Sequence, residues 1–100
     1  MDARAIIAQI RDRHVPSAEE LRWFAAGLAD GTVTDAQAGA FAMAVVLNGL
    51  GEAGRVALTR GMRDSGKVLS WDLPGPVVDK HSTGGIGDCV SLLLAPALAA

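Results

Sequence analysis

Residues 17–28 read Ser17-Ala18-Glu19-Glu20-Leu21-Arg22-Trp23-Phe24-Ala25-Ala26-Gly27-Leu28, and this stretch decides the fold of the first part of the chain. The Ser17 hydroxyl can accept a hydrogen bond from the Glu20 amide, while the Glu20 side chain reaches back, which is the signature of a helix N-terminus. Apolar residues then recur at the spacing of one helical face, at Leu21, Phe24, Ala25 and Leu28. The pattern predicts an amphipathic helix that ends at Gly31, where glycine favours a left-handed cap.

Three more helices are predicted around this one. A first apolar face comprises Ala3, Ile6, Ile7 and Ile10. A second capping box at Thr34–Gln37 precedes a helix rich in alanine and glycine, whose small side chains suit either the core or a homodimer face. A fourth helix is expected over residues 52–63, with one side formed by Val56, Thr59 and Met62. Residues 1–65 are therefore predicted to be an α-helical domain of four short helices.

Composition excludes several classes of protein. Nine basic and eleven acidic residues leave a net charge of −2, which argues against a strongly basic nucleic-acid binder. The single cysteine, Cys89, cannot form an intramolecular disulfide. No apolar run is long enough to span a bilayer, and residues 1–4 do not resemble a signal peptide. We expect a cytoplasmic protein with neither nucleic acid nor membrane as a partner.

Residues 66–76 are expected to form a linker, because Leu73-Pro74-Gly75-Pro76 is a stiff connector. A short strand is predicted over residues 76–79, followed by a glycine-rich loop and an apolar helix from Val90 that contains Pro96. A lone strand cannot make a sheet, and this helix has no sheet to cover. Residues 77–100 are therefore expected to begin an α/β domain that is incomplete here, as part of a longer two-domain protein.

The strand, glycine loop and helix favour phosphate binding, because loop amides and the helix N-terminus both attract anions. Lys80 adds a full positive charge at the end of the predicted strand. A Walker A motif is not met, since Val68 follows Gly66-Lys67 where serine or threonine is required. A dinucleotide fingerprint fails as well, because Val90 stands where glycine or alanine is needed.

The run Asp79-Lys80-His81-Ser82-Thr83-Gly84-Gly85-Ile86-Gly87-Asp88, followed by Ser91-Leu92 and Ala95-Pro96, closely resembles the signature of the thymidine and pyrimidine-nucleoside phosphorylase family. Residues 62–66, Met-Arg-Asp-Ser-Gly, resemble the segment that precedes it. The resemblance implies reversible phosphorolysis of a pyrimidine (deoxy)nucleoside to a free base and (deoxy)ribose 1-phosphate. It also implies a cytoplasmic homodimer through the helical domain, with an active site between that domain and an α/β domain.

The same resemblance assigns roles to individual positions. Lys80 and His81 are the expected catalytic residues, with His81 contacting or protonating the base. The expected phosphate ligands are Lys80, Ser82, Thr83, Gly84, Gly85 and Ser91. Backbone oxygens of Gly87 and Cys89 match a potassium site, and no organic cofactor is expected.

Two other readings stay open at this point. An anthranilate-type phosphoribosyltransferase is similar in having an N-terminal helical domain and a glycine-rich loop. Its motif lacks the residues Lys80-His81-Ser82 that precede the glycines here. A non-catalytic helical dimerisation module would use residues 1–65 alone. These 100 residues by themselves are not expected to catalyse the reaction.

Overall fold

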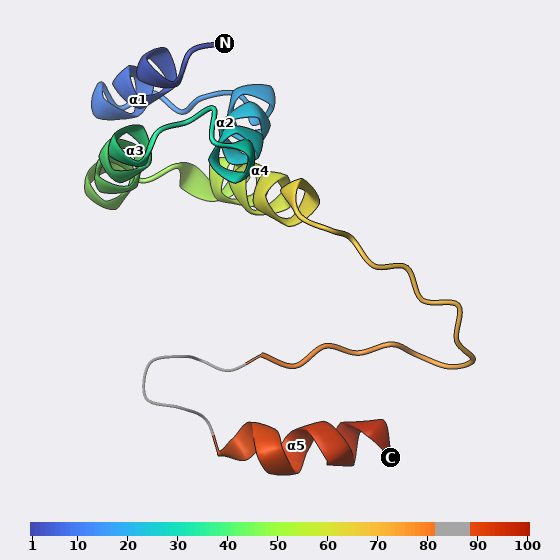
Figure 1. Ribbon diagram of the computed structural model, residues 1–100. Coiled ribbons are helices and arrows are strands. Elements are labelled where there is room, and N and C mark those ends of the chain that lie inside the picture. Colours follow the sequence, from blue (N-terminus) through green and yellow to red (C-terminus); the bar gives the residue numbers. More distant parts are fainter. Residues whose placement is uncertain (82–88) are drawn as a thin grey trace. The chain divides into compact units, whose positions relative to one another are not determined.

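The computed structural model describes residues 1–81 and 89–100 (Figure 1). The described residues form five helices, which are α1 (Ala3–Arg11), α2 (Ala18–Asp30), α3 (Asp35–Asn48), α4 (Gly51–Ser65) and α5 (Val90–Ala99). The chain divides into two compact units, Met1–Val68 with α1 to α4 and Leu69–Ala100 with α5. The predicted helical bundle is therefore confirmed.

Both predicted capping boxes are present. At the start of α2, the Glu20 amide donates to Ser17 Oγ at 3.2 Å and the Ser17 amide donates to Glu20 Oε2 at 2.8 Å. Thr34 and Gln37 repeat this arrangement at the start of α3. Each box satisfies two of the backbone N–H groups that a helix N-terminus leaves without partners.

A left-handed residue ends each of the first two helices. Gly31 closes α2 at φ +84°, as predicted. After α1 the left-handed residue is Arg13, at φ +66°. The amide of His14 donates to the carbonyl of Gln9 at 2.8 Å and that of Arg13 to the carbonyl of Ile10 at 3.0 Å. This pair of bonds is the Schellman arrangement, which usually places glycine at the left-handed position.

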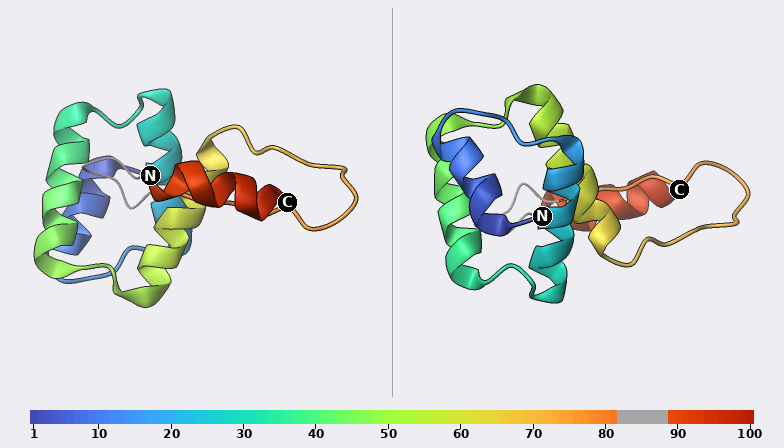
Figure 2. Two further views of the ribbon diagram at one scale, coloured as in Figure 1. Left: turned by 90° about the horizontal axis from the view of Figure 1, so that it is seen from below. Right: turned by 90° about the horizontal axis from the view of Figure 1, so that it is seen from above.

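The core of the first unit lies between two helix pairs. α1 packs with α3, and α2 packs with α4. The helices α2 and α4 lie side by side in both views of Figure 2. The rings of Phe24 and Phe41 stack with centroids 4.1 Å apart, which joins α2 to α3. The largest fully buried side chains are Phe24, Ile6, Ile10, Leu21 and Leu50.

The predicted fourth helix is confirmed as α4, but the side that packs is not the one that carries its larger side chains. Val56, Thr59 and Met62 are all exposed, and the buried positions of α4 are Gly54 and Gly61. A Cβ atom on Gly61 would lie only 3.0 Å from Ala25 Cβ, so the glycine lets α4 approach α2 closely. Leu28 is likewise exposed rather than buried on α2, where Gly27 is buried instead. In α2 and α4, glycines are thus buried at positions of close approach, while the larger apolar side chains Leu28, Val56 and Met62 remain exposed.

In the second unit, the predicted strand over residues 76–79 is not formed. Residues 67–81 contain neither helix nor strand, and Val77 and Val78 are exposed. Strand backbone needs a neighbour for its hydrogen bonds, and no second strand occurs in the described ranges 1–81 and 89–100. The helix predicted from Val90 is confirmed as α5, which continues through Pro96 and exposes its apolar side chains. None of the helices described is long and apolar enough to cross a membrane.

Candidate functional site

The structure brings together two of the predicted phosphate ligands in the second unit. The ammonium group of Lys80 donates a hydrogen bond to Ser91 Oγ, across eleven positions of the sequence. Both residues are half-buried. Ser91 lies in the first turn of α5, where helix N–H groups and the positive end of the helix dipole favour an anion. A cation and a hydroxyl donor therefore meet at the N-terminus of a helix.

The neighbouring predicted residues are described only in part. His81 is exposed and directly follows Lys80 in a segment without helix or strand. The predicted ligands Ser82, Thr83, Gly84 and Gly85 lie outside the described residues, as does Gly87 of the predicted potassium site. Their proposed roles stay predictions.

Cys89 is the N-cap residue of α5 and carries an exposed, free thiol. Its carbonyl accepts a hydrogen bond from the Leu92 amide at 3.3 Å. A carbonyl oxygen has two lone pairs, so this hydrogen bond is compatible with the predicted potassium contact, which stays a prediction. Within the described ranges, no three His, Cys, Asp or Glu residues are grouped as a metal site would require.

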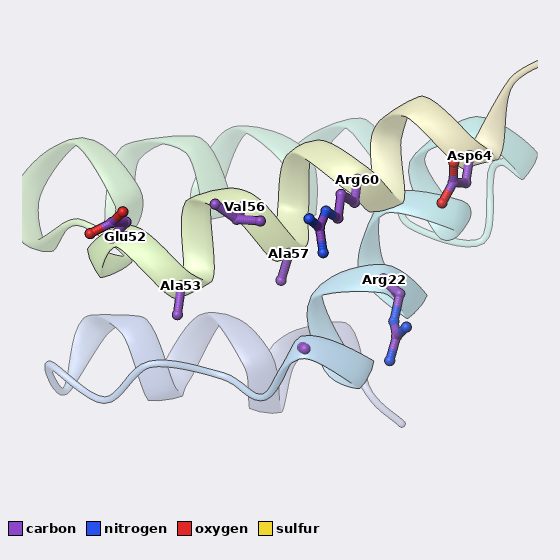
Figure 3. A pocket seen from close by; sticks show the side chains of 8 residues that line it. Arg22, Glu52, Ala53, Val56, Ala57, Arg60 and Asp64 are labelled. Carbon is purple, nitrogen blue, oxygen red and sulfur yellow. The ribbon is translucent and has the colours of Figure 1, made fainter.

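A groove that sequence reasoning missed lies between α2 and α4 (Figure 3). Its volume is about 600 Å³. Ala53, Val56 and Ala57 follow one another along the α4 side, while Arg22 projects from α2. The small residues Ala53 and Ala57, one helical turn apart, were the only signal in the sequence. The signal is weak because the other wall comes from α2, a helix much earlier in the chain.

Arginines surround the carboxylate at one end of this groove. Arg63 donates to the two carboxylate oxygens of Asp64 at 2.7 and 3.2 Å. These hydrogen bonds lower the pKa of Asp64, and the positive charges of Arg60 and Arg22 act in the same direction. Arg63 and Asp64 thus form an ion pair on the surface of α4. Since both members are exposed, we expect the pair to add little stability.

Comparison with known proteins places this architecture in a family. The family described as "Glycosyl transferase family, helical bundle domain" matches residues 4–66. The chain is 62% identical over 96 residues to a thymidine phosphorylase of Mesorhizobium japonicum, covering 95% of this chain and 22% of that protein. It is 53% identical over 97 residues to a thymidine phosphorylase of Burkholderia lata, covering 94% of this chain and 22% of that protein.

The chain spans about a fifth of the length of these curated relatives. The family match covers α1 to α4, and the similarity to the two relatives extends over nearly all of the chain. We conclude that this chain belongs to the glycosyl transferase family with the helical bundle domain, and that it is similar to the N-terminal part of thymidine phosphorylases.

Proposed function

We propose that this chain is part of an enzyme that phosphorolyses pyrimidine (deoxy)nucleosides, with thymidine as the favoured substrate. The observation that carries the proposal is the 62% identity to a thymidine phosphorylase over 95% of this chain. The hydrogen bond between Lys80 and Ser91 supports it, because both residues match phosphate ligands in the resemblance. The products are the free base and (deoxy)ribose 1-phosphate.

The proposed reaction is a direct displacement at the sugar. A phosphate oxygen forms a bond to C1′ while the bond from C1′ to the base nitrogen breaks, and its electron pair leaves with the base. Positive charge develops on the sugar and negative charge on the base, so a bound phosphate dianion stabilises the first and a proton donor the second. No covalent intermediate on the enzyme is required.

In this proposal the residues divide between phosphate and base. Lys80 and Ser91 bind phosphate together with Ser82, Thr83 and the amides of Gly84 and Gly85. His81, whose imidazole suits proton transfer near neutral pH, donates the proton to the departing base.

The remaining parts of the proposal concern the whole enzyme. An α/β domain completes the active site, the enzyme is a cytoplasmic homodimer, and the 100 residues alone are inactive. A potassium ion on the carbonyls of Gly87 and Cys89 would hold the loop in place electrostatically.

The test uses the longer enzyme that carries this chain, with thymidine, uridine and phosphate as substrates. Lys80→Met removes a charged hydrogen-bond donor worth about 1.5–3 kcal/mol. We therefore expect kcat/KM for phosphate to fall about 10- to 100-fold, with little change in the KM for nucleoside. Lys67→Met is the matched control, because Lys67 is the other lysine of this sequence and is exposed.

Two results would overturn the proposal. One is an enzyme that consumes phosphoribosyl pyrophosphate and leaves thymidine and uridine intact, which would favour the phosphoribosyltransferase alternative. The other is a Lys80→Met variant with the same phosphate dependence as Lys67→Met.

A further inference from the structure

Two arginines from different helices line the same end of the groove between α2 and α4. Arg22 comes from α2 and Arg60 from α4, and both lie toward the end that Asp64 lines (Figure 3). Among the residues that the structure describes, neither arginine forms a hydrogen bond or a salt bridge. A guanidinium group presents five N–H donors in a planar fork, so both side chains are available to an anion bound in the groove.

The nearby carboxylate does not neutralise these two charges. Arg63 already donates to both oxygens of Asp64, at 2.7 and 3.2 Å. Arg22 and Arg60 act on Asp64 through their charge alone, which lowers its pKa. Three arginines against one carboxylate leave a net charge of +2 at this end of the groove. The site is therefore suited to an anion that carries more than one negative charge.

Gly61 accounts for the meeting of the two arginines. A Cβ atom at this position would lie 3.1 Å from Arg22 Cα and 3.4 Å from Arg22 Cγ, so the stem of Arg22 packs against the backbone of α4. Arg60 directly precedes Gly61, and Asp64 lies one helical turn after Arg60. Packing thus holds the stem of Arg22 beside α4, which reduces the conformational entropy that the side chain loses when a ligand binds.

The rest of the groove is apolar and ends at a carboxylate. Ala53, Val56 and Ala57 follow one another along the α4 wall, and Glu52 lies at the end opposite the arginines (Figure 3). Glu52 and Arg60 are eight positions apart, which is about 12 Å along a helix. The volume of about 600 Å³ is within the range of small-molecule sites. A matching ligand has an anionic head, an apolar ring and an N–H donor at its far end.

We propose that the groove between α2 and α4 binds a nucleoside 5′-monophosphate. The phosphate accepts hydrogen bonds from Arg22 and Arg60, the base lies against Val56, and an N–H group of the base donates to the carboxylate of Glu52. This site uses none of the residues of the phosphate site proposed at Lys80, and the inference does not depend on phosphorolysis.

The chemistry of the lining favours this class of ligand over simpler anions. A phosphomonoester carries a charge of about −1.5 to −2 at pH 7, which matches the two arginines better than the single charge of a carboxylate does. Arginine also binds phosphate oxygens in a bidentate geometry. The side chains of Ala53, Val56 and Ala57 offer no hydrogen-bonding groups, so this wall favours the face of a ring over an open sugar phosphate.

Two-dimensional NMR of the 100-residue chain, titrated with uridine 5′-monophosphate, tests where the ligand binds. We expect saturable shifts of the amides of Arg22, Ala53, Val56 and Ala57, with a dissociation constant at or below about 1 mM. Uridine, ribose 5-phosphate and inorganic phosphate should each bind at least about tenfold more weakly, because each makes only part of the contacts. Shifts confined to residues around Lys80, or equal binding of any of these three fragments, would overturn the proposal.

Charge-removing variants test the assignment of the arginines. Arg22→Gln and Arg60→Gln shorten the side chain and remove its charge, so each should raise the dissociation constant about tenfold. Arg55→Gln is the matched control, because Arg55 is another exposed arginine of α4, is not among the groove's lining residues and donates to the Gly51 carbonyl at 3.3 Å. Circular dichroism checks that each variant remains helical. An equal loss of affinity in Arg55→Gln would show that binding follows net charge alone, and would overturn the proposal.

The longer enzyme that carries this chain provides the second readout. In a Lys80→Met background, which weakens the other proposed phosphate site, calorimetry with uridine 5′-monophosphate compares Arg60→Gln with Arg55→Gln. We expect about a tenfold weaker affinity for Arg60→Gln alone. Equal affinities would show that another part of the enzyme covers the groove, and would overturn this inference while leaving the proposed function intact. Binding at the groove by an enzyme that cleaves no nucleoside would overturn the proposed function alone.

Discussion

The side-chain amide of Asn48 donates a hydrogen bond to the carbonyl oxygen of Ile10 at 2.9 Å, joining the end of α3 to the end of α1. The same nitrogen lies 3.2 Å from the carbonyl oxygen of Arg11. The Ile10 carbonyl also accepts the Arg13 amide at 3.0 Å in the turn that ends α1, so Asn48 adds a second donor to it from another helix. The bond spans 38 positions and is part-buried.

Replacing Asn48 by alanine should destabilise the bundle by about 0.5–1.5 kcal/mol, because it removes the side-chain hydrogen bond that joins α3 to α1. Urea denaturation followed by circular dichroism measures the change. Thr59→Ala is the control, since among the described residues the Thr59 hydroxyl donates only to the Arg55 carbonyl of its own helix, and alanine has the higher helix propensity. Equal losses of unfolding free energy in the two variants would show that the hydrogen bond between α1 and α3 contributes no more than one within a single helix.

Arg13→Gly should stabilise the chain. Arg13 holds a left-handed conformation at φ +66°, which costs an ordinary L-residue about 1–2 kcal/mol and glycine much less. Glycine loses more conformational freedom on folding, so we expect a net gain of about 0.5–1 kcal/mol. Arg13→Ala keeps the Cβ atom while removing the charge, and a comparable gain in that variant would contradict the backbone explanation.

The stability of α2 should depend on pH through Glu20. Hydrogen bonds from the Ser17 amide and then from the Gln9 side chain lower the pKa of Glu20 below its ordinary 4.5. A lowered folded-state pKa contributes stability above the unfolded-state value, and this contribution is lost as the pH falls through the folded-state pKa.

Between about pH 6 and about pH 3, the wild type should therefore lose more stability than Glu20→Gln, which retains a capping side chain without the charge. Thermal melts across this range measure the difference. Glu19→Gln is the control, because Glu19 makes no hydrogen bond among the residues described. A Glu20→Gln profile that runs parallel to the wild type would refute the assignment.

Gly61→Ala should separate α4 from α2. The added Cβ atom would lie 3.0 Å from Ala25 Cβ and 3.1 Å from Arg22 Cα, and overpacking of this kind costs about 1–3 kcal/mol. Alanine's helix propensity offsets up to about 1 kcal/mol of this. At concentrations where the chain is monomeric, Gly39→Ala should instead raise the melting temperature, because open space surrounds that position. A stabilised Gly61→Ala protein would show that the two helices can move apart freely.

The sequence predicted the residues of the phosphate loop but not the groove between α2 and α4. A lysine before a glycine-rich loop indicated phosphate binding, and the resemblance of the wider motif identified Ser91 as a second phosphate ligand. The structure places Lys80 against Ser91, whereas the groove between α2 and α4 had no comparable signal, since its walls come from Ala18 and Arg22 on one side and α4 on the other.

The helix starts at Ser17 and Thr34 and the turn at Gly31 followed from the sequence, because each depends on hydrogen bonds or backbone conformations within a few residues. The buried face of α4 was decided by tertiary structure, since the close approach of α2 buries Gly54 and Gly61 and leaves Val56 and Met62 exposed. The extended segment at Val77 and Val78 likewise depends on a partner strand for its backbone hydrogen bonds. Local bonding specifies where a helix begins and ends, whereas the choice of buried face depends on which neighbour can come closest.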